Sequence, residues 1–445
     1  MSGLYTDLYE LRMAASYLKR RMIGPATFSL FARKLPARRG FLVAAGLDDA
    51  LTFLEEFRFD DAEIDYLRDA VGLDEASLTT LRGTRFTGDV WAVPEGRVVF
   101  AGEPLLEVTA PIAEAQLVET ALLNLLTFQT TIASKAARCR IAAGQAELID
   151  FALRRTHGLE AGIGVARASA VAGFAATSNV EAARRYGLRP AGTMAHSFIE
   201  AFADERSAFR AFAVDFPANA IFLVDTYDTL GGVRAAIDVA DELGLTGPVG
   251  IRLDSGDLGP LARSARRVLD DAGLARAKIV ASGGLDEDDI ARLAGQAAPI
   301  DIYGVGTRMG VSADAPSLDS AYKLVAFGER PVMKLSEGKV TDPGAKQVFR
   351  DESGTYRDVL ALRDEPAPPG HEPLLEPVMR AGRRVIEMTR AGAVAQAAKR
   401  FEHDLAWLPD AARRLADPVP IRVRHSDRLS SLREHVADQL AGRGR

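Results

Sequence analysis

The run Val249-Gly-Ile-Arg-Leu-Asp254-Ser-Gly-Asp257 shows the pattern that decides the fold of this chain. Its first half is rich in apolar and β-branched residues, as a buried strand is, and its second half changes to carboxylates, serine and glycine. The same change from a short apolar run to a polar cluster recurs along the middle of the sequence. The other runs are Leu148-Ile-Asp-Phe151, a run near Ala191, Ile221-Phe-Leu-Val-Asp225, Ile279-Val-Ala-Ser282 and Ile302-Tyr-Gly304.

Stretches with helical periodicity, such as 234–243 and 261–274, separate these runs. Strands that alternate with helices predict a parallel sheet, because each crossover helix returns the chain to the same end of the sheet. Six or seven such units favour a barrel over an open doubly wound sheet. The pattern therefore predicts an α/β fold with a barrel in the middle of the chain.

The two ends of the chain carry a different pattern. Residues 1–115 combine helical periodicity with short alternating runs such as Ala26-Thr-Phe-Ser-Leu-Phe-Ala32, which predicts an α+β domain. Residues 116–333 hold the barrel pattern and the candidate active site. Residues 334–445 return to a mixed pattern, and the last hundred of them carry no motif with an evident function.

The composition excludes several classes of protein. With 47% hydrophobic and 26% charged residues, the chain has the make-up of a globular protein. Its net charge of −6 gives no general basic surface, so we expect no nucleic-acid partner. No apolar run approaches the length of a membrane span, and the N-terminus lacks the pattern of a signal peptide. A single cysteine, Cys139, fits a reducing compartment, and we expect a cytoplasmic protein.

Polar residues follow each apolar run, at the edge where a parallel barrel builds its active site. The turns Ser282-Gly-Gly284 and Gly304-Val-Gly306-Thr307 can present backbone N–H groups to a phosphate. Cations suited to phosphate or carboxylate are supplied by Arg154, Arg155 and Arg252. Carboxylates that could hold Mg²⁺ together with substrate phosphates are Asp225, Asp228, Asp254 and Asp257. The set indicates phosphorylated substrates, although no Walker-type phosphate loop is present.

A histidine stands in the stretch Ala191-Gly-Thr-Met-Ala-His196-Ser-Phe-Ile-Glu200. The apolar spacing after it predicts a helix that begins there, and a helix N-terminus favours anionic groups. A neutral imidazole is a competent nucleophile near pH 7. His196 is therefore a candidate catalytic residue.

Several motifs in this order closely resemble nicotinate phosphoribosyltransferases, over residues 6 to about 350. They are Thr6-Asp-Leu-Tyr9-Glu-Leu, Ala26-Thr-Phe, Phe31-Ala-Arg-Lys-Leu-Pro36, Gly192-Thr-Met-Ala-His196-Ser, Val224-Asp-Thr-Tyr-Asp228-Thr, Ile251-Arg-Leu-Asp-Ser-Gly-Asp257 and Lys334-Leu-Ser-Glu-Gly-Lys339-Val-Thr. The resemblance implies an irregular α/β barrel with an additional α/β sandwich, which the N-terminal segment and part of the C-terminal segment build.

The resemblance also implies a reaction. Nicotinate and 5-phosphoribosyl 1-diphosphate would give nicotinate mononucleotide and diphosphate, on the Preiss-Handler route of NAD biosynthesis. ATP would be a co-substrate, and its hydrolysis would be coupled to transfer through a phosphohistidine at His196. Mg²⁺ would be bound through the diphosphate, with Asp225 and Asp254 as further contacts to the metal and the ribose. The enzyme would be a homodimer with shared active sites.

Carried over position by position, the resemblance assigns further roles. Tyr9 would stack on the pyridine ring from a partner subunit, and Phe151 would cover the other face of the ring. Thr193 and Arg252 would contact nicotinate, and Arg154 would lie near the phosphates. The 5-phosphoribosyl 1-diphosphate would also contact the glycine-rich turns at Gly283, Gly284, Gly304, Gly306 and Thr307.

Three alternatives remain at the level of the sequence. A nicotinamide phosphoribosyltransferase shares the architecture, but it carries an aspartate where this chain has Ser178. A carboxylate there would repel nicotinate, so its absence favours the acid over the amide. A non-catalytic binding protein on the same scaffold would not need His196, Arg252, Asp254 and Thr307 together. An unrelated barrel lyase would share the polar edge but not the ordered motifs.

Overall fold

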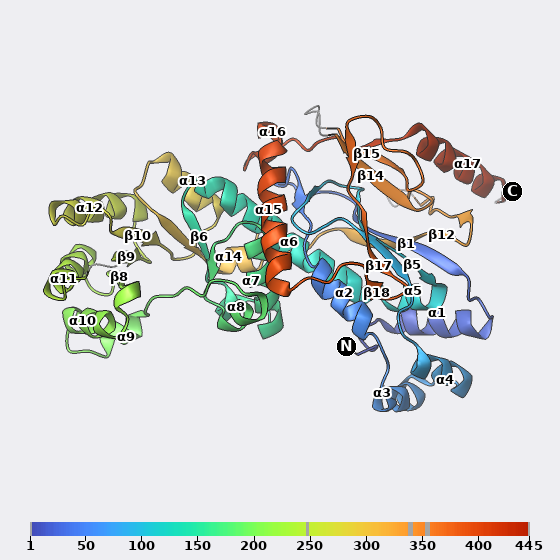
Figure 1. Ribbon diagram of the computed structural model, residues 1–445, viewed down its shortest axis with the longest axis horizontal. Coiled ribbons are helices and arrows are strands. Elements are labelled where there is room, and N and C mark those ends of the chain that lie inside the picture. The colour runs from blue at the N-terminus through green and yellow to red at the C-terminus, as the bar shows by residue number, and fades with distance from the viewer. Residues whose placement is uncertain (1, 246–248, 337–340, 352–356, 444–445) are drawn as a thin grey trace. The chain divides into compact units, whose positions relative to one another are not determined.

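The computed structural model describes residues 2–245, 249–336, 341–351 and 357–443 (Figure 1). Part of the Lys334–Thr341 motif, residues 337–340, lies outside the described residues. The chain forms two compact units. Unit 1 consists of Met1–Ser134 with Ser317–Arg445, and unit 2 consists of Lys135–Pro316. The domain boundaries at 115 and 333 stay predictions, whereas the division into compact units falls inside helix α6 and ahead of strand β12.

Unit 2 is built on a parallel sheet, as the alternating pattern predicts. In the described residues the strand order is β7-β6-β11-β10-β9-β8. The strands are β6 (Glu147–Asp150), β7 (Ala176–Thr177), β8 (Ile221–Leu223), β9 (Gly250–Leu253), β10 (Lys278–Ala281) and β11 (Ile302–Val305). Within this sheet β11 pairs with β6, and the sheet is open between its edge strands β7 and β8, which we call the seam.

Helices follow the strands of unit 2 and cover the sheet. Figure 1 shows α11 and α12 beside strands β8 to β10, and α12 packs on both β9 and β10. The helices that begin in unit 2 are α7 (Leu159–Val171), α8 (Val180–Tyr186), α9 (His196–Glu200), α10 (Glu205–Asp215), α11 (Thr229–Glu242), α12 (Leu258–Asp271), α13 (Glu287–Gly295) and α14 (Thr307–Gly310), with 3₁₀ turns η2 (Leu153–Arg155) and η3 (Pro217–Asn219). Side chains cap α8, α10, α11 and α13 through Asn179, Asp204, Asp228 and Asp286.

Unit 1 contains the sandwich that the resemblance implies. Its largest sheet, in the described residues, runs β13-β12-β1-β5-β3-β17-β18 and so mixes strands from both ends of the chain. These strands are β1 (Pro25–Ala32), β3 (Asp89–Ala92), β5 (Pro104–Pro111), β12 (Ser320–Phe327), β13 (Arg330–Pro331), β17 (Glu376–Arg380) and β18 (Arg383–Arg384). Smaller sheets hold β2 (Leu42–Val43), β4 (Val98–Val99), β14 (Lys346–Asp351), β15 (Val359–Leu362), β16 (His371–Pro373) and β19 (Arg424–His425).

The core of unit 1 lies between these sheets and their helices. Phe28 of β1 stacks on Tyr322 of β12 with ring centroids 4.7 Å apart, and both side chains are buried. The helices are α1 (Leu8–Lys19), α2 (Leu47–Glu56), α3 (Asp61–Tyr66), the π-helical turn η1 (Leu67–Val71), α4 (Glu75–Gly83), α5 (Ile112–Leu117), α6 (Glu119–Ala143), α15 (Arg390–Trp407), α16 (Asp410–Arg413) and α17 (Asp427–Arg443). Among the helices of the described ranges, none combines the length and hydropathy that crossing a membrane requires.

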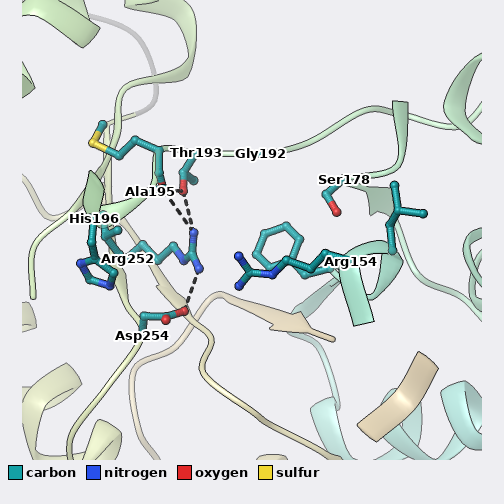
Figure 2. Close-up of a pocket in the computed structure, with 12 residues that line it drawn as sticks. Arg154, Ser178, Gly192, Thr193, Ala195, His196, Arg252 and Asp254 are labelled. Atoms are coloured by element: carbon teal, nitrogen blue, oxygen red, sulfur yellow. Dashed lines mark hydrogen bonds and ion pairs between the residues drawn. The ribbon is translucent and has the colours of Figure 1, made fainter. Parts of the chain in front are cut away.

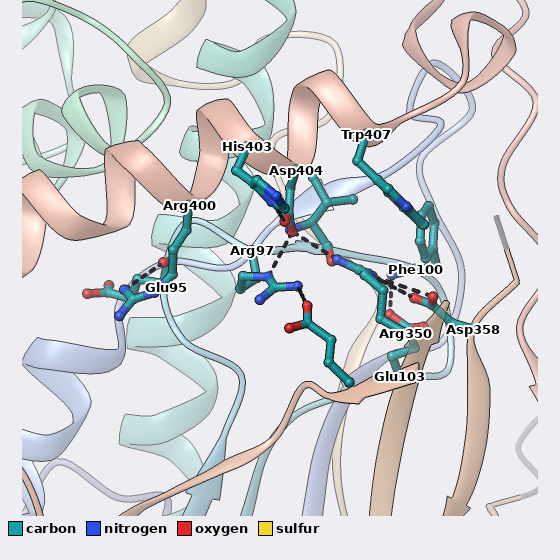
Figure 3. A network of polar contacts seen from close by, with 12 residues as sticks. Glu95, Arg97, Phe100, Glu103, Arg350, Asp358, Arg400, His403, Asp404 and Trp407 are labelled. Carbon is teal, nitrogen blue, oxygen red and sulfur yellow. Dashed lines mark hydrogen bonds and ion pairs between the residues drawn. The ribbon is translucent and has the colours of Figure 1, made fainter. Parts of the chain in front are cut away.

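A buried ionic network joins helix α15 to other segments of unit 1 (Figure 3). Arg350 of β14 contacts Asp358 and Asp404, each at 2.8 Å, and its guanidinium lies 4.8 Å from the centroid of Trp407. Asp404 also accepts a hydrogen bond from Arg97 at 3.0 Å. Arg97 and Asp404 lie far from Arg350 in the sequence, so the network connects segments that no local pattern links.

We predict that Arg350→Met destabilises unit 1 by about 3–5 kcal/mol, because it leaves two buried carboxylates without their shared cation. Thermal and denaturant unfolding followed by circular dichroism measure the effect. Arg68→Met is the matched control, since Arg68 pairs with Asp65 and Glu75 on the exposed surface. The control should unfold near the wild-type midpoint. An Arg350→Met protein with the wild-type midpoint would contradict the importance of the network.

Candidate active site

A pocket of about 370 Å³ lies at the carboxyl ends of the strands of the parallel sheet (Figure 2). Phe151 follows β6, Ser178 follows β7 and Asp254 follows β9. The pocket is lined by Phe151, Leu153, Arg154, Ser178, Gly192, Thr193, Met194, Ala195, His196, Leu223, Arg252 and Asp254. Six residues predicted from the sequence thus lie around one cavity: Phe151, Arg154, Thr193, His196, Arg252 and Asp254.

The guanidinium group of Arg252 is the centre of this arrangement. Its Nε donates a hydrogen bond to Ser282 Oγ at 2.8 Å, and its Nη1 donates to Thr193 Oγ1 at 3.0 Å. Its Nη2 forms an ion pair with Asp254 at 2.7 Å. The guanidinium carbon lies 5.3 Å from the centroid of the Phe151 ring. One side chain therefore links its own segment to three others, those of Ser282, Thr193 and Phe151.

Asp254 is ionised in this environment. Burial by itself would raise the pKa of Asp254, but the hydrogen bond from Ser282 and the charge of Arg252 hold it below the ordinary value of an aspartate. The positive charge of His196, when it is protonated, acts in the same direction. A carboxylate with a depressed pKa remains available to stabilise positive charge that develops on a substrate.

Asp225, a predicted catalytic and metal-binding residue, is hydrogen-bonded to the backbone of Asp254. Its Oδ2 accepts hydrogen bonds from the Asp254 backbone N–H at 2.9 Å and from Ser255 Oγ at 2.6 Å. Its Oδ1 is buried without a hydrogen-bond partner. A carboxylate oxygen in this situation can accept a proton or a cation. The described residues contain no group of three or more metal-ligating side chains, so a metal here would need ligands from the substrate.

Two further acidic residues of this region, Asp228 and Glu205, have surroundings that the sequence alone does not reveal. Asp228 accepts a hydrogen bond from the Gly231 N–H at 2.6 Å and so caps α11. Glu205, which the sequence patterns do not single out, stands at the start of α10. Burial and the charges of Asp225 and Asp228 raise the pKa of Glu205 to about 7. Only the folded structure places these carboxylates close enough to interact.

His196 is the first residue of α9, as the apolar spacing predicts, although that helix is only five residues long. The strand expected near Ala191 is absent: among the described residues this stretch forms a single bridge, between Thr177 and Pro190, and is otherwise loop. The loop after this bridge leads to α9, whose first residue, His196, lines the pocket. The His196 Nδ1 lies 3.1 Å from Thr226 Oγ1. This contact leaves Nε2 as the second reactive nitrogen of the ring.

Phe151 also lines the pocket, and Figure 2 shows Arg154 on the side of the pocket opposite His196. Gly304 of the neighbouring strand β11 makes room for the Phe151 ring, and Gly306, just after that strand, approaches the Phe151 backbone. A Cβ atom at Gly304 would lie 2.4 Å from Phe151 Cε2, and one at Gly306 would lie 3.1 Å from the Phe151 carbonyl oxygen. Both glycines are predicted phosphate contacts, and neither lines the pocket.

The remaining predicted phosphate contacts stand at the edge of unit 2. Gly283 has a φ of +99°, and a Cβ atom there would lie 1.9 Å from the Asp254 carbonyl oxygen. Only glycine fits such a position. Gly284 and Thr307 are exposed, and Thr307 begins the short helix α14. The three residues follow β10 and β11, at the same ends of the strands as the pocket, but they are not part of its lining.

Asp150, at the end of β6, was not predicted as a site residue, yet it lies directly behind the pocket wall. Its side chain is fully buried, and burial raises the pKa of Asp150 to about 6. Relative to an ordinary aspartate, a shift of this size costs the folded protein about 3 kcal/mol at neutral pH. The cost is present above the folded pKa and disappears as the pH falls below the unfolded one.

Tyr9 belongs to unit 1 and is about half exposed. Burial of its hydroxyl end, with the carboxylates of Glu119 and Glu10, raises the pKa of Tyr9. Neighbouring apolar side chains on the same surface are also exposed, namely Tyr5, Leu8 and Met13. We refer to these three residues and Tyr9 as the α1 apolar surface. Exposed apolar patches of this kind often mark a surface that another molecule covers.

Unit 1 also contains a basic hollow of about 820 Å³ that the sequence did not reveal. Its cations are Arg33, Lys34, Arg357, Arg422 and Arg424. Arg33 and Lys34 fall in a motif quoted above, and Arg33 is paired with Asp319 at 2.7 Å. Arg357, Arg422 and Arg424 are far from that motif in sequence, and no sequence pattern predicts that they lie near it.

Comparison with known proteins gives a consistent result. The family model described as the nicotinate phosphoribosyltransferase (NAPRTase) N-terminal domain matches residues 4–127, and the model of the NAPRTase family matches residues 146–351. The nicotinate phosphoribosyltransferase pncB2 of Mycobacterium tuberculosis is 51% identical over 388 residues, which cover 86% of this chain and 83% of that protein.

Two further relatives extend this result. The nicotinate phosphoribosyltransferase of Bacillus subtilis is 44% identical over 376 residues, covering 82% of this chain and 76% of its own. The crystal structure of human nicotinic acid phosphoribosyltransferase superimposes with a TM-score of 0.85 at 31% identity, covering 97% of this chain and 99% of the human one.

Proposed function

This chain belongs to the nicotinate phosphoribosyltransferase family, and from that premise we propose that it joins nicotinate to 5-phosphoribosyl 1-diphosphate. The products are nicotinate mononucleotide and diphosphate, and the nucleotide enters NAD biosynthesis by the Preiss-Handler route. The observation that carries the proposal is the pocket itself. It places an aromatic ring, two arginines and an ionised carboxylate around one cavity at the carboxyl end of a parallel sheet.

Each wall of the pocket has a task in this reaction. The Phe151 ring offers a flat surface on which a pyridine ring can stack. Arg252 and Thr193 lie beside it and suit the nicotinate carboxylate. Arg154 takes a substrate phosphate, and the glycine-rich turns that follow β10 and β11 add backbone N–H donors at the edge. As the bond between C1 of the ribose and the diphosphate breaks, positive charge develops on the ribose, and Asp254 stabilises it.

Mg²⁺ is the metal that this reaction would use. Asp225 has a buried carboxylate oxygen without a partner, and Mg²⁺ commonly binds one or two carboxylates together with substrate phosphates. The residues therefore fit a magnesium ion that arrives with the diphosphate. When bound, the ion neutralises the leaving diphosphate. The chain contributes the carboxylates of Asp225 and Asp254, which orient the ribose and hold the charge.

We further propose that ATP is coupled to the reaction through His196. The lone pair of one ring nitrogen attacks the γ-phosphorus of ATP, the bond to the bridging oxygen breaks, and ADP leaves with the electron pair. Water later attacks the phosphohistidine and releases phosphate. The position of His196 in the pocket lining and its contact with Thr226 support this role, because they hold the ring at the site where the substrates meet.

The active form is proposed to be a homodimer with shared active sites. The α1 apolar surface supports this, since a second copy would cover it and would receive the ring of Tyr9. The glutamates beside the Tyr9 hydroxyl anchor that end of the side chain while the ring remains exposed. Tyr9 would then stack on the pyridine ring opposite Phe151.

A nicotinamide-specific enzyme is the second candidate. Ser178 lines the pocket next to Arg154, and a nicotinamide enzyme of this architecture carries an aspartate there. A pocket with two arginines and no carboxylate on that wall suits an anionic ring substrate better than a neutral amide. The third candidate, a non-catalytic binding protein, does not account for an ionised Asp254 beside His196.

We predict a preference for nicotinate over nicotinamide on the order of a hundredfold in kcat/KM, because an unmatched polar group in the pocket costs a few kcal/mol. Nucleotide formation from each base, with and without ATP, measures it. Ser178→Asp should lower kcat/KM for nicotinate by charge repulsion. Ser178→Asn introduces a side chain of the same size as aspartate but without the charge, and it should change kcat/KM less. Comparable turnover of the two bases by the wild type would refute the assignment.

The second prediction concerns His196. His196→Ala and His196→Asn should fold and should lose both phosphoenzyme formation and ATP hydrolysis, while slow ATP-independent transfer remains. The measurement is acid-labile, base-stable label from γ-labelled ATP. His157→Ala, which removes an exposed histidine outside the pocket lining, should label like the wild type. Wild-type labelling of His196→Ala would place the phosphorylated residue elsewhere.

The third prediction concerns the shared site. Tyr9→Ala and His196→Ala proteins should each have low activity, and a mixture that exchanges subunits should regain part of it, because hybrid dimers contain one intact site. The same mixture under conditions without exchange is the control. If exchange is demonstrated and the activity does not rise, Tyr9 and His196 act in the same subunit or Tyr9 does not act at all.

A further inference from the structure

The Asp150 carboxylate connects the segments that follow β6 and β7. Its Oδ1 accepts a hydrogen bond from the Ala152 N–H at 2.8 Å, and its Oδ2 accepts one from the Thr177 hydroxyl at 2.7 Å. Thr177 Oγ1 in turn accepts a hydrogen bond from the Asn179 N–H at 3.0 Å. The carboxylate is therefore the point at which the ends of β6 and β7 are tied together.

These two segments form one side of the pocket. The segment after β6 carries Phe151 and Arg154, and the segment after β7 carries Ser178. Figure 2 shows Arg154 and Ser178 across the pocket from His196 and Asp254. The Ser178 N–H also donates to the Asp150 carbonyl oxygen at 2.8 Å. Asp150 itself does not line the cavity, so any effect it has on a ligand is transmitted through these neighbours.

The Ala152 N–H and the Thr177 hydroxyl both donate to the Asp150 carboxylate, and the hydroxyl oxygen also accepts from the Asn179 N–H. No ion pair joins Asp150 to a cation in the described part of the chain, and burial opposes its charge. An asparagine would avoid the buried charge but would present an NH₂ group to the Thr177 hydroxyl.

We propose that Asp150, acting with Thr177, is a positioning residue that sets the side of the pocket where the aromatic acid binds. It holds Phe151, Arg154 and Ser178 at the spacing that receives the pyridine ring. The inference rests on the proposed function. It adds a determinant of affinity for nicotinate that touches neither substrate nor metal.

The test compares four full-length proteins: wild type, Asp150→Asn, Thr177→Val and Thr177→Ser. We expect KM for nicotinate to rise about tenfold in Asp150→Asn and Thr177→Val, which corresponds to the loss of one strong buried hydrogen bond. The kcat should stay near the wild-type value, because His196, Arg252 and Asp254 keep their contacts. Thr177→Ser retains the hydroxyl and should restore the wild-type KM.

A pH profile separates positioning from plain structural support. Asp150 faces the Thr177 hydroxyl and the Ala152 N–H, and it becomes protonated as the pH falls through about 6. KM for nicotinate should therefore rise below pH 6 in the wild type, and this step should be missing in Asp150→Asn. The titratable groups of the pocket itself, His196 and Asp254 among them, are present in both proteins and cancel in the comparison.

Each outcome decides the proposal. A wild type that forms no nucleotide from nicotinate overturns both this inference and the proposed function. An active wild type whose KM is unchanged in Asp150→Asn and Thr177→Val overturns this inference alone. Asp150→Asn should unfold at the wild-type temperature or above at pH 8, because a buried charge has been removed. If it unfolds at a lower temperature with kcat and KM both impaired, Asp150 is a structural residue and the inference is wrong.

Discussion

The guanidinium of Arg252 is the interaction on which the pocket depends. Its planar donors contact Ser282 after β10, Thr193 in the seam loop and Asp254 after β9, and its face lies over Phe151 after β6. Arginine can do this because its donors point in fixed directions within one plane. The same contacts keep Asp254 ionised at a partly buried position. Position and charge in the pocket therefore have a single common cause.

The segment between the edge strands β7 and β8 supplies one side of the pocket. It carries Thr193 and His196, which line the cavity, and its backbone accepts a hydrogen bond from Arg252 at Met194. Cations and carboxylates then meet around one aromatic wall. This combination suits anionic substrates whose reaction develops positive charge on a sugar.

Much of the pocket could be predicted because its residues stand at strand ends, where a local pattern marks them. Phe151, Arg252 and Asp254 each follow or end a short apolar run, and His196 precedes a helical spacing. Asp150 and Glu205 escaped prediction for the opposite reason. Their significance lies in burial and in neighbours distant along the chain, and neither leaves a trace in the local sequence. The close packing of Gly304 against the Phe151 ring illustrates the same limit, because no local pattern indicates it.

The sequence by itself determined the kinds of elements, the order of strands and helices along the chain, and the residue types at the strand ends. Periodicity and turn chemistry depend on neighbours a few positions apart, so they can be read locally. Only the tertiary structure decided that β7 and β8 are the edge strands of the parallel sheet and that Asp228 caps a helix. It also decided that Asp150 is buried, without an ion pair in the described residues. Those outcomes depend on long-range packing, in which a carboxylate's environment is set by segments that the chain brings together only when it folds.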